Sequence, residues 1–144
     1  MWRPAKRYPE PWDRLDDLIE DSRLIAPDEV LHELHGRDDP LLKWARERKK
    51  MFRRTSRDIV HRVQEILAKF ALIDPDQPRT SADPFVIALA VKVQKSGGLF
   101  PTEVTVVTEE KYAPGRPRIP HVCEAYGLKY LTIHQMFLFE GWTF

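Results

Sequence analysis

The residues of this sequence that could carry out chemistry are carboxylates at the expected ends of helices and strands. Asp83 lies at the start of an apolar segment that favours a helix ending near residue 96, with Ser81 or Asp83 as its cap. Glu109 and Glu110 directly follow the β-branched run 104–108, which is typical of a strand buried on both faces. Open α/β sheets place their ligands outside the carboxyl ends of the strands, so these carboxylates can converge on one metal ion. A metal there points to phosphodiester chemistry.

Composition limits the class of protein. The 144 residues amount to about one domain, and we expect a single domain over residues 1–144. Lys and Arg total 23 against 22 Asp and Glu, so the net charge of +1 gives no general attraction to nucleic acid. Cys123 is the single cysteine, and no apolar run approaches the roughly 20 residues of a membrane span. We therefore expect a protein of the reducing cytoplasm.

Helices and short strands must position these carboxylates. Apolar spacing predicts helices over residues 12–20, 27–36, 39–54, 56–70, 83–96, 120–126 and 135–140. Short apolar runs predict strands over residues 24–26, 104–108 and 130–133. Residues 2–11, 74–80 and 113–120 read as irregular segments because of their prolines. This alternation predicts a three-layer α/β/α domain around a parallel sheet.

Five segments resemble a known family and occur in its order along nearly the whole chain. They are PDEVLHEL (27–34), ADPFVIALA (82–90), VVTEE (106–110), RIPHVC (118–123) and EGWTF (140–144). Together they resemble the PIN-like domains, in a bacterial and archaeal group related to the VapC-type toxins. The resemblance implies a PIN-like fold and a ribonuclease dependent on Mg²⁺ or Mn²⁺.

The resemblance also implies site residues and partners. Glu33, Asp83 and Glu110 would hold the ion, with Glu109 as the alternative to Glu110. Thr108 would help to position the site. Oxygen ligands suit such hard cations. The implied substrate is single-stranded RNA or tRNA. The implied partner is a cognate antitoxin, with a homodimer as a further assembly and no membrane.

The chain departs from the family pattern at its start. The family begins with a central strand that carries an Asp followed by Ser or Thr, and that Asp is a principal metal ligand. This chain opens at Met1-Trp2-Arg3 and reaches Arg7-Tyr8-Pro9 at once, so that strand is expected to be missing. A late start codon, a shortened chain and a decayed gene are equally open explanations. The loss would leave unpaired backbone groups on the two neighbouring strands.

Ordinary structural roles compete with these functional ones. Asp83 is a usual helix cap, Glu33 a usual solvated helix position, and Glu109 and Glu110 a usual charged loop. His32 and His35 lie three apart and do not form the HExxH zinc pattern, so zinc is disfavoured. Cys123 is expected to be a small core residue of a helix instead of a nucleophile.

Basic residues gather between positions 43 and 57. The residues expected to contact RNA phosphates are Lys43, Arg46, Lys50, Arg53 and Arg54, with Arg48, Lys49 and Arg57 in the same stretch. Trp44 and Phe52 could stack on bases or could pack inward beneath a solvated face. An acidic antitoxin segment is a third candidate for this surface.

A second class of function stays open at this point. The chain could be a non-catalytic protein-binding or decayed PIN-like module, which pairs an open sheet edge with a strand of a partner. A monomer that folds well by itself would count against that alternative.

Overall fold

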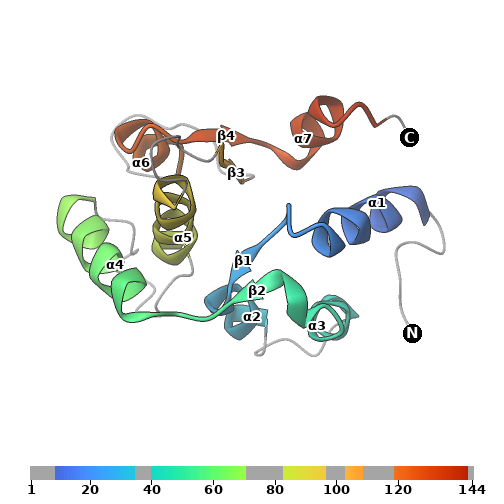
Figure 1. The fold of residues 1–144 in the computed structure, drawn as a ribbon, viewed down its shortest axis with the longest axis horizontal. Coiled ribbons are helices and arrows are strands. Elements are labelled where there is room, and N and C mark those ends of the chain that lie inside the picture. Colours follow the sequence, from blue (N-terminus) through green and yellow to red (C-terminus); the bar gives the residue numbers. More distant parts are fainter. Residues whose placement is uncertain (1–8, 35–39, 71–82, 97–102, 109–118, 143–144) are drawn as a thin grey trace. The chain divides into compact units, whose positions relative to one another are not determined.

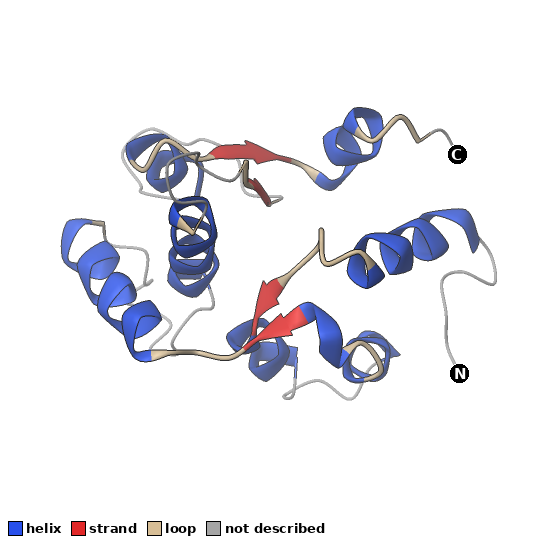
Figure 2. Cartoon of the chain, in the orientation of Figure 1, coloured by secondary structure: helices blue, strands red, loops and turns tan. Residues whose placement is uncertain are grey.

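The computed structural model describes residues 9–34, 40–70, 83–96, 103–108 and 119–142 (Figure 1). The chain divides into two compact units, Met1–Thr55 together with Phe144, and Ser56–Thr143. Helices dominate both units, and each unit contains a short parallel sheet (Figure 2). The predicted α/β class is confirmed. That residues 1–144 form one domain stays a prediction.

The first unit begins with helix α1, Pro9–Glu20. This helix starts before the predicted position because Pro9 and Pro11 occupy its first turn, where backbone N–H groups have no acceptor within the helix. Strand β1, Ala26–Pro27, follows, and helix α2, Asp28–Leu34, continues directly from it. Asp28 and Glu29 lie in the first turn of α2, where the helix dipole favours negative charge.

The helix predicted over residues 39–54 is wrong in its second half. Helix α3 spans only Pro40–Arg46, and the 3-10 turn η2, Lys49–Met51, leads into strand β2, Phe52–Arg53. Strand β2 pairs in parallel with β1, with Ala26 opposite Phe52. The chain leaves the helix here because it gains a strand partner far away in sequence, which helical spacing cannot reveal.

The core of the first unit is built around Trp44. Its ring meets that of Trp12 edge to face, with centroids 5.0 Å apart and planes at 76°. The buried members of this core are Ile19, Trp44, Ala45 and Met51, and the partly buried ones are Trp12, Leu24, Ala26, Leu31, Leu41 and Phe52. These contacts hold α1, α3 and the β1–β2 pair together as one packed unit.

Two helices form the base of the second unit. Helix α4, Arg57–Lys69, follows Ser56, whose extended backbone makes it the N-cap residue. Helix α5, Asp83–Lys95, packs against α4. Both helices were predicted, and the buried residues that they contribute are Ile59, Val63, Ile66, Pro84, Ile87, Ala88, Leu89, Ala90 and Val91. Helix α5 is apolar around much of its circumference because α4, β3 and α6 all contact it.

A parallel pair of strands completes this unit. Strand β3, Thr105–Val107, pairs with β4, Lys129–Leu131, so that Val106 lies opposite Tyr130. Val106 is buried but Thr105 is exposed, so the prediction that this strand is buried on both faces is wrong. Helix α6, Ile119–Ala125, precedes β4, as predicted.

The last helix begins earlier than its spacing indicates. Helix α7 spans Ile133–Phe139. Thr132, predicted to lie within a strand, instead caps α7: its hydroxyl accepts from the backbone N–H of Gln135 at 3.1 Å, and the Gln135 side chain accepts from the N–H of Thr132 at 2.9 Å. This reciprocal capping box satisfies two N–H groups that the helix leaves open, and so it ends β4 at Leu131.

Candidate functional site

Asp83 is the first residue of α5 and is half-buried, with the fully buried Pro84 behind it. A carboxylate in the first turn is stabilised by the positive end of the helix dipole. The predicted position at a helix start is therefore confirmed for Asp83. As the first residue within α5, Asp83 lies one position after the N-cap, where its charge favours the helix start whether or not it binds a metal.

Thr108 directly follows strand β3 and is also half-buried. Its backbone N–H donates to the carbonyl of Leu131 at 2.9 Å, which continues the β3–β4 ladder by one bond. Asp83 begins α5 and Thr108 directly follows β3, and these two elements contact each other. Glu109 and Glu110, the next two residues, lie outside the described residues.

Glu33 lies on α2 in the first unit and is exposed. The described residues contain no group of three or more His, Cys, Asp or Glu that could hold a metal ion. Glu33 belongs to the first unit and Asp83 to the second, and Glu109 and Glu110 are not described. The Mg²⁺ or Mn²⁺ site therefore stays a prediction. His32 is exposed on α2, and His35 is not described.

Several of the predicted RNA-contacting cations already have protein partners in the first unit. Lys50 pairs with Glu20 at 3.1 Å, and Arg53 donates to the carbonyl of Lys50 at 2.6 Å. Lys43, Arg46 and Arg54 are exposed and make no ion pair with another described residue. Of the five cations predicted to contact RNA, these three are the ones that stay accessible to a polyanion.

The two aromatic residues of this cluster pack inward. Trp44 is 6% exposed, and Phe52 packs on the same core. The guanidinium of Arg48 lies 4.6 Å from the centre of the Trp44 ring, so it covers an aromatic face that a base would need. The surface can offer charge to RNA, but Trp44 does not offer a stacking platform.

Cys123 is completely buried in α6. Burial, assisted by the charge of Glu124, raises the pKa of its thiol from the ordinary value of 9.0 to about 12. The thiol therefore stays protonated at neutral pH and is a poor nucleophile. The prediction that Cys123 is a core residue is confirmed.

Comparison with known proteins places the chain in a family. Residues 4–144 match the model of the family described as "Domain of unknown function (DUF4411)". The chain belongs to the DUF4411 family. No curated protein and no solved structure matches it.

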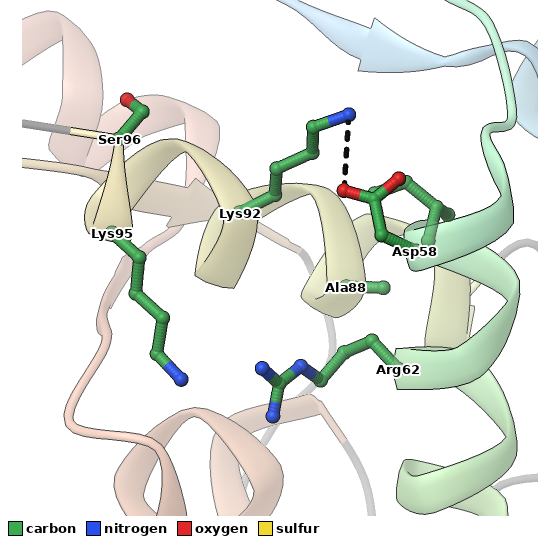
Figure 3. Close-up of a pocket in the computed structure, with 7 residues that line it drawn as sticks. Asp58, Arg62, Ala88, Lys92, Lys95 and Ser96 are labelled. Atoms are coloured by element: carbon green, nitrogen blue, oxygen red, sulfur yellow. Dashed lines mark ion pairs between the residues drawn. The ribbon is translucent and has the colours of Figure 1, made fainter.

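One further polar site of this DUF4411 chain was not predicted from the sequence. A groove of about 350 Å³ lies between α4 and α5 and is lined by Asp58, Ile59, Arg62, Ala88, Lys92, Lys95 and Ser96 (Figure 3). Lys92 and Lys95 stand three apart on α5, which places them on one face of a helix. That spacing was a readable signal. Only the packing of α4 on α5 adds Arg62 to the same place.

No described helix of this DUF4411 protein is long and apolar enough to cross a membrane.

Proposed function

We propose that this DUF4411 protein is a PIN-like domain related to the VapC-type toxins, and that it acts in the cytoplasm as a Mg²⁺- or Mn²⁺-dependent endoribonuclease. Its substrate is single-stranded RNA or tRNA, and a cognate antitoxin controls it. The single observation that carries the proposal is the relation of α5 to β3. A helix that begins with Asp83 packs on a parallel strand that ends next to Thr108.

This relation supports a site because of the direction of the chain. Helix α5 precedes β3 and contacts it, the order found in α/β layers whose helices run antiparallel to the strands that they cover. In such a layer the start of the helix lies at the same edge as the carboxyl end of the strand. That edge is where open α/β folds bind their ligands.

The residues that would hold the ion are Glu33, Asp83 and Glu110, with Glu109 as the alternative to Glu110. A bound divalent ion supplies an activated water and neutralises charge on the phosphate. Asp83 is suited to this work because it is half-buried, which limits competition from solvent for its oxygen atoms. Thr108 is held in place by its backbone hydrogen bond to Leu131 and can orient the groups that follow it.

The decisive experiment is the cleavage of labelled single-stranded RNA and tRNA by the full chain in Mn²⁺, with and without EDTA. Asp83→Asn removes the charge of the central ligand. Asp28→Asn is the matched control, because Asp28 is the first residue of α2 as Asp83 is of α5. We expect cleavage that EDTA abolishes, that Asp83→Asn reduces by at least about 100-fold, and that Asp28→Asn leaves unchanged.

Two results would contradict the proposal. Cleavage that survives Asp83→Asn would remove Asp83 from the metal site. A folded chain that cleaves neither RNA in Mn²⁺ would remove the activity itself and favour the second candidate function.

That second candidate is a non-catalytic, protein-binding PIN-like module, and the size of the sheets favours it. Within the described residues each sheet has two strands of two or three residues, so each strand has an edge with no described strand beside it. Sheets this small gain stability from another strand, and strand addition is a recognised binding mode. Amide hydrogen exchange at Thr105 and Val107, whose N–H groups point away from β4, tests this candidate when measured by NMR on a chain shown to be monomeric by ultracentrifugation. Strong protection in the monomer would rule it out.

A further inference from the structure

The groove between α4 and α5 is open, positively charged and, among the described residues, lined by none of the predicted metal ligands. Two buried apolar residues, Ile59 and Ala88, are part of its lining. Figure 3 shows Arg62 reaching from α4 and Lys95 from α5 into the same open region, while Lys92 turns toward Asp58. Its volume of about 350 Å³ falls at the small end of the range for ligand sites, roughly 300–1,000 Å³.

The charges around this groove do not cancel. Its lining holds three cations, Arg62, Lys92 and Lys95, against one carboxylate, Asp58. The only other carboxylate paired with these cations in the described structure is Glu65, which Arg62 shares with Lys69. Counting Lys69 and Glu65, four cations are balanced by only two carboxylates, which leaves a surplus of two positive charges. The carboxyl end of α5 opposes an anion by only about half a charge.

The hydrogen-bond donors of the groove are also in excess. Arg62 donates from one nitrogen to Glu65 at 2.7 Å, and a guanidinium has five N–H donors. Lys92 contacts the hydroxyl oxygen of Ser56 at 3.1 Å and Asp58 at 3.3 Å, which leaves one of its three donors. Lys95 makes no ion pair with any described residue and keeps all three.

Asp58 does not block the site. Its carboxylate accepts from the hydroxyl of Ser56, and this bond, together with the nearby Lys92 ammonium, lowers the pKa of Asp58. The negative charge of Asp58 therefore lies on one side of the groove, next to Lys92. Arg62 and Lys95 face the opposite side (Figure 3).

We propose that this groove binds a phosphate group, held by the guanidinium of Arg62 and the ammonium group of Lys95, while Lys92 on the Asp58 side adds positive charge. Arg presents paired donors that match two oxygens of a phosphate, and Lys adds point charges. The chemistry suits a free phosphate or phosphate monoester and also one phosphate of an RNA strand. The site does not depend on the proposed ribonuclease activity, because it uses none of the predicted metal ligands.

The test is binding by the full chain in EDTA, so that metal-dependent cleavage cannot contribute. Inorganic phosphate, adenosine monophosphate and a short single-stranded RNA are titrated separately, and the amide resonances of α4 and α5 are followed by NMR. Lys95→Glu reverses one groove charge at an exposed position. Lys129→Glu is the matched control, because Lys129 is exposed in the same unit, outside the groove, and pairs with Glu103 at 2.7 Å.

We expect inorganic phosphate or the monophosphate to shift the amides of α4 and α5. Lys95→Glu should weaken this binding at least about tenfold, whereas Lys129→Glu should change it less than about twofold. If RNA is the only probe that binds more weakly to Lys95→Glu than to Lys129→Glu, the phosphate bound in the groove is one of a polynucleotide. If no probe separates Lys95→Glu from Lys129→Glu, the proposal is overturned. Cleavage assays decide the ribonuclease proposal separately.

Discussion

Arg48 donates two hydrogen bonds to the carboxylate of Asp16, from Nε to Oδ1 at 2.7 Å and from Nη2 to Oδ2 at 3.1 Å. The same guanidinium lies against the Trp44 ring and donates to the Trp44 carbonyl at 3.2 Å. The hydrogen bonding of its guanidinium to the Asp16 carboxylate is the main reason that the pKa of Arg48 is raised. Arg48 thus ties α1 to the segment after α3, although it lies within the stretch predicted to meet RNA.

We expect Asp16→Asn to lower the free energy of unfolding by about 1–2 kcal/mol, because it weakens the bidentate, partly buried ion pair between Arg48 and Asp16. Glu20→Gln is the control on the same helix, since Glu20 and Lys50 form an ion pair whose two side chains are both exposed. It should cost less than about 0.5 kcal/mol. Urea unfolding of both variants measures the difference. Equal costs would show that the Arg48–Asp16 pair adds nothing beyond an ordinary surface pair.

The capping box at α7 leads to a second prediction. Thr132→Ala removes the hydroxyl that accepts from Gln135 and should cost about 1 kcal/mol of stability, whereas Thr132→Ser keeps the acceptor and should cost only a few tenths. Thermal or urea unfolding distinguishes the two. A serine variant as unstable as the alanine variant would mean that the methyl group, and not the cap, stabilises this helix.

Acid should weaken the ion pairs on α4. The hydrogen bond from Lys69 and the charge of Arg62 lower the pKa of Glu65 below its ordinary value of 4.5. A lowered folded-state pKa adds stability above pH 4.5, and this stability is lost as the pH falls through the folded-state value. The melting temperatures of the wild-type chain and Glu65→Gln should therefore converge as the pH is lowered from neutral through the folded-state pKa of Glu65. About 1 M salt should shrink the difference at neutral pH. A gap that stays constant with pH would contradict this assignment.

The buried thiol leads to a fourth prediction. Because Cys123 is fully buried and its pKa is about 12, a thiol reagent at pH 8 should react with it only after unfolding. Reaction with Ellman's reagent in buffer and in denaturant measures this directly, with free cysteine as the control. Rapid labelling of the folded chain would show that α6 opens readily.

The exposed cations of the first unit provide a prediction about RNA. Lys43→Gln combined with Arg46→Gln should weaken RNA binding and reduce its dependence on salt by about 0.7 in slope for each lost contact with a single strand. Lys129→Gln, an exposed change in the other unit, serves as the control. Filter binding at several salt concentrations measures the slope. An unchanged slope would remove this surface from the RNA interface.

The helices with clear apolar spacing were predictable because their pattern is local. Ile59, Val63 and Ile66 repeat along one face of α4, and burial of that face confirms the helix. Thr132 and Gln135 also formed a readable capping signal, yet the strand-favouring residues Tyr130, Thr132 and Ile133 led to the prediction of a longer strand. The metal site could be inferred only from resemblance, because each carboxylate alone has an ordinary structural use.

The sequence by itself determined the α/β class, the position of Asp83 at a helix start and the burial of Cys123, because each depends on residue type and local spacing. Tertiary structure alone decided that residues 52–53 pair with β1, that Arg48 is held by Asp16, and that Arg62 meets Lys95 across a groove. The physical reason is the same in each case. These contacts join residues about 25 or more positions apart, and their energy depends on which surfaces pack together, which no local pattern contains.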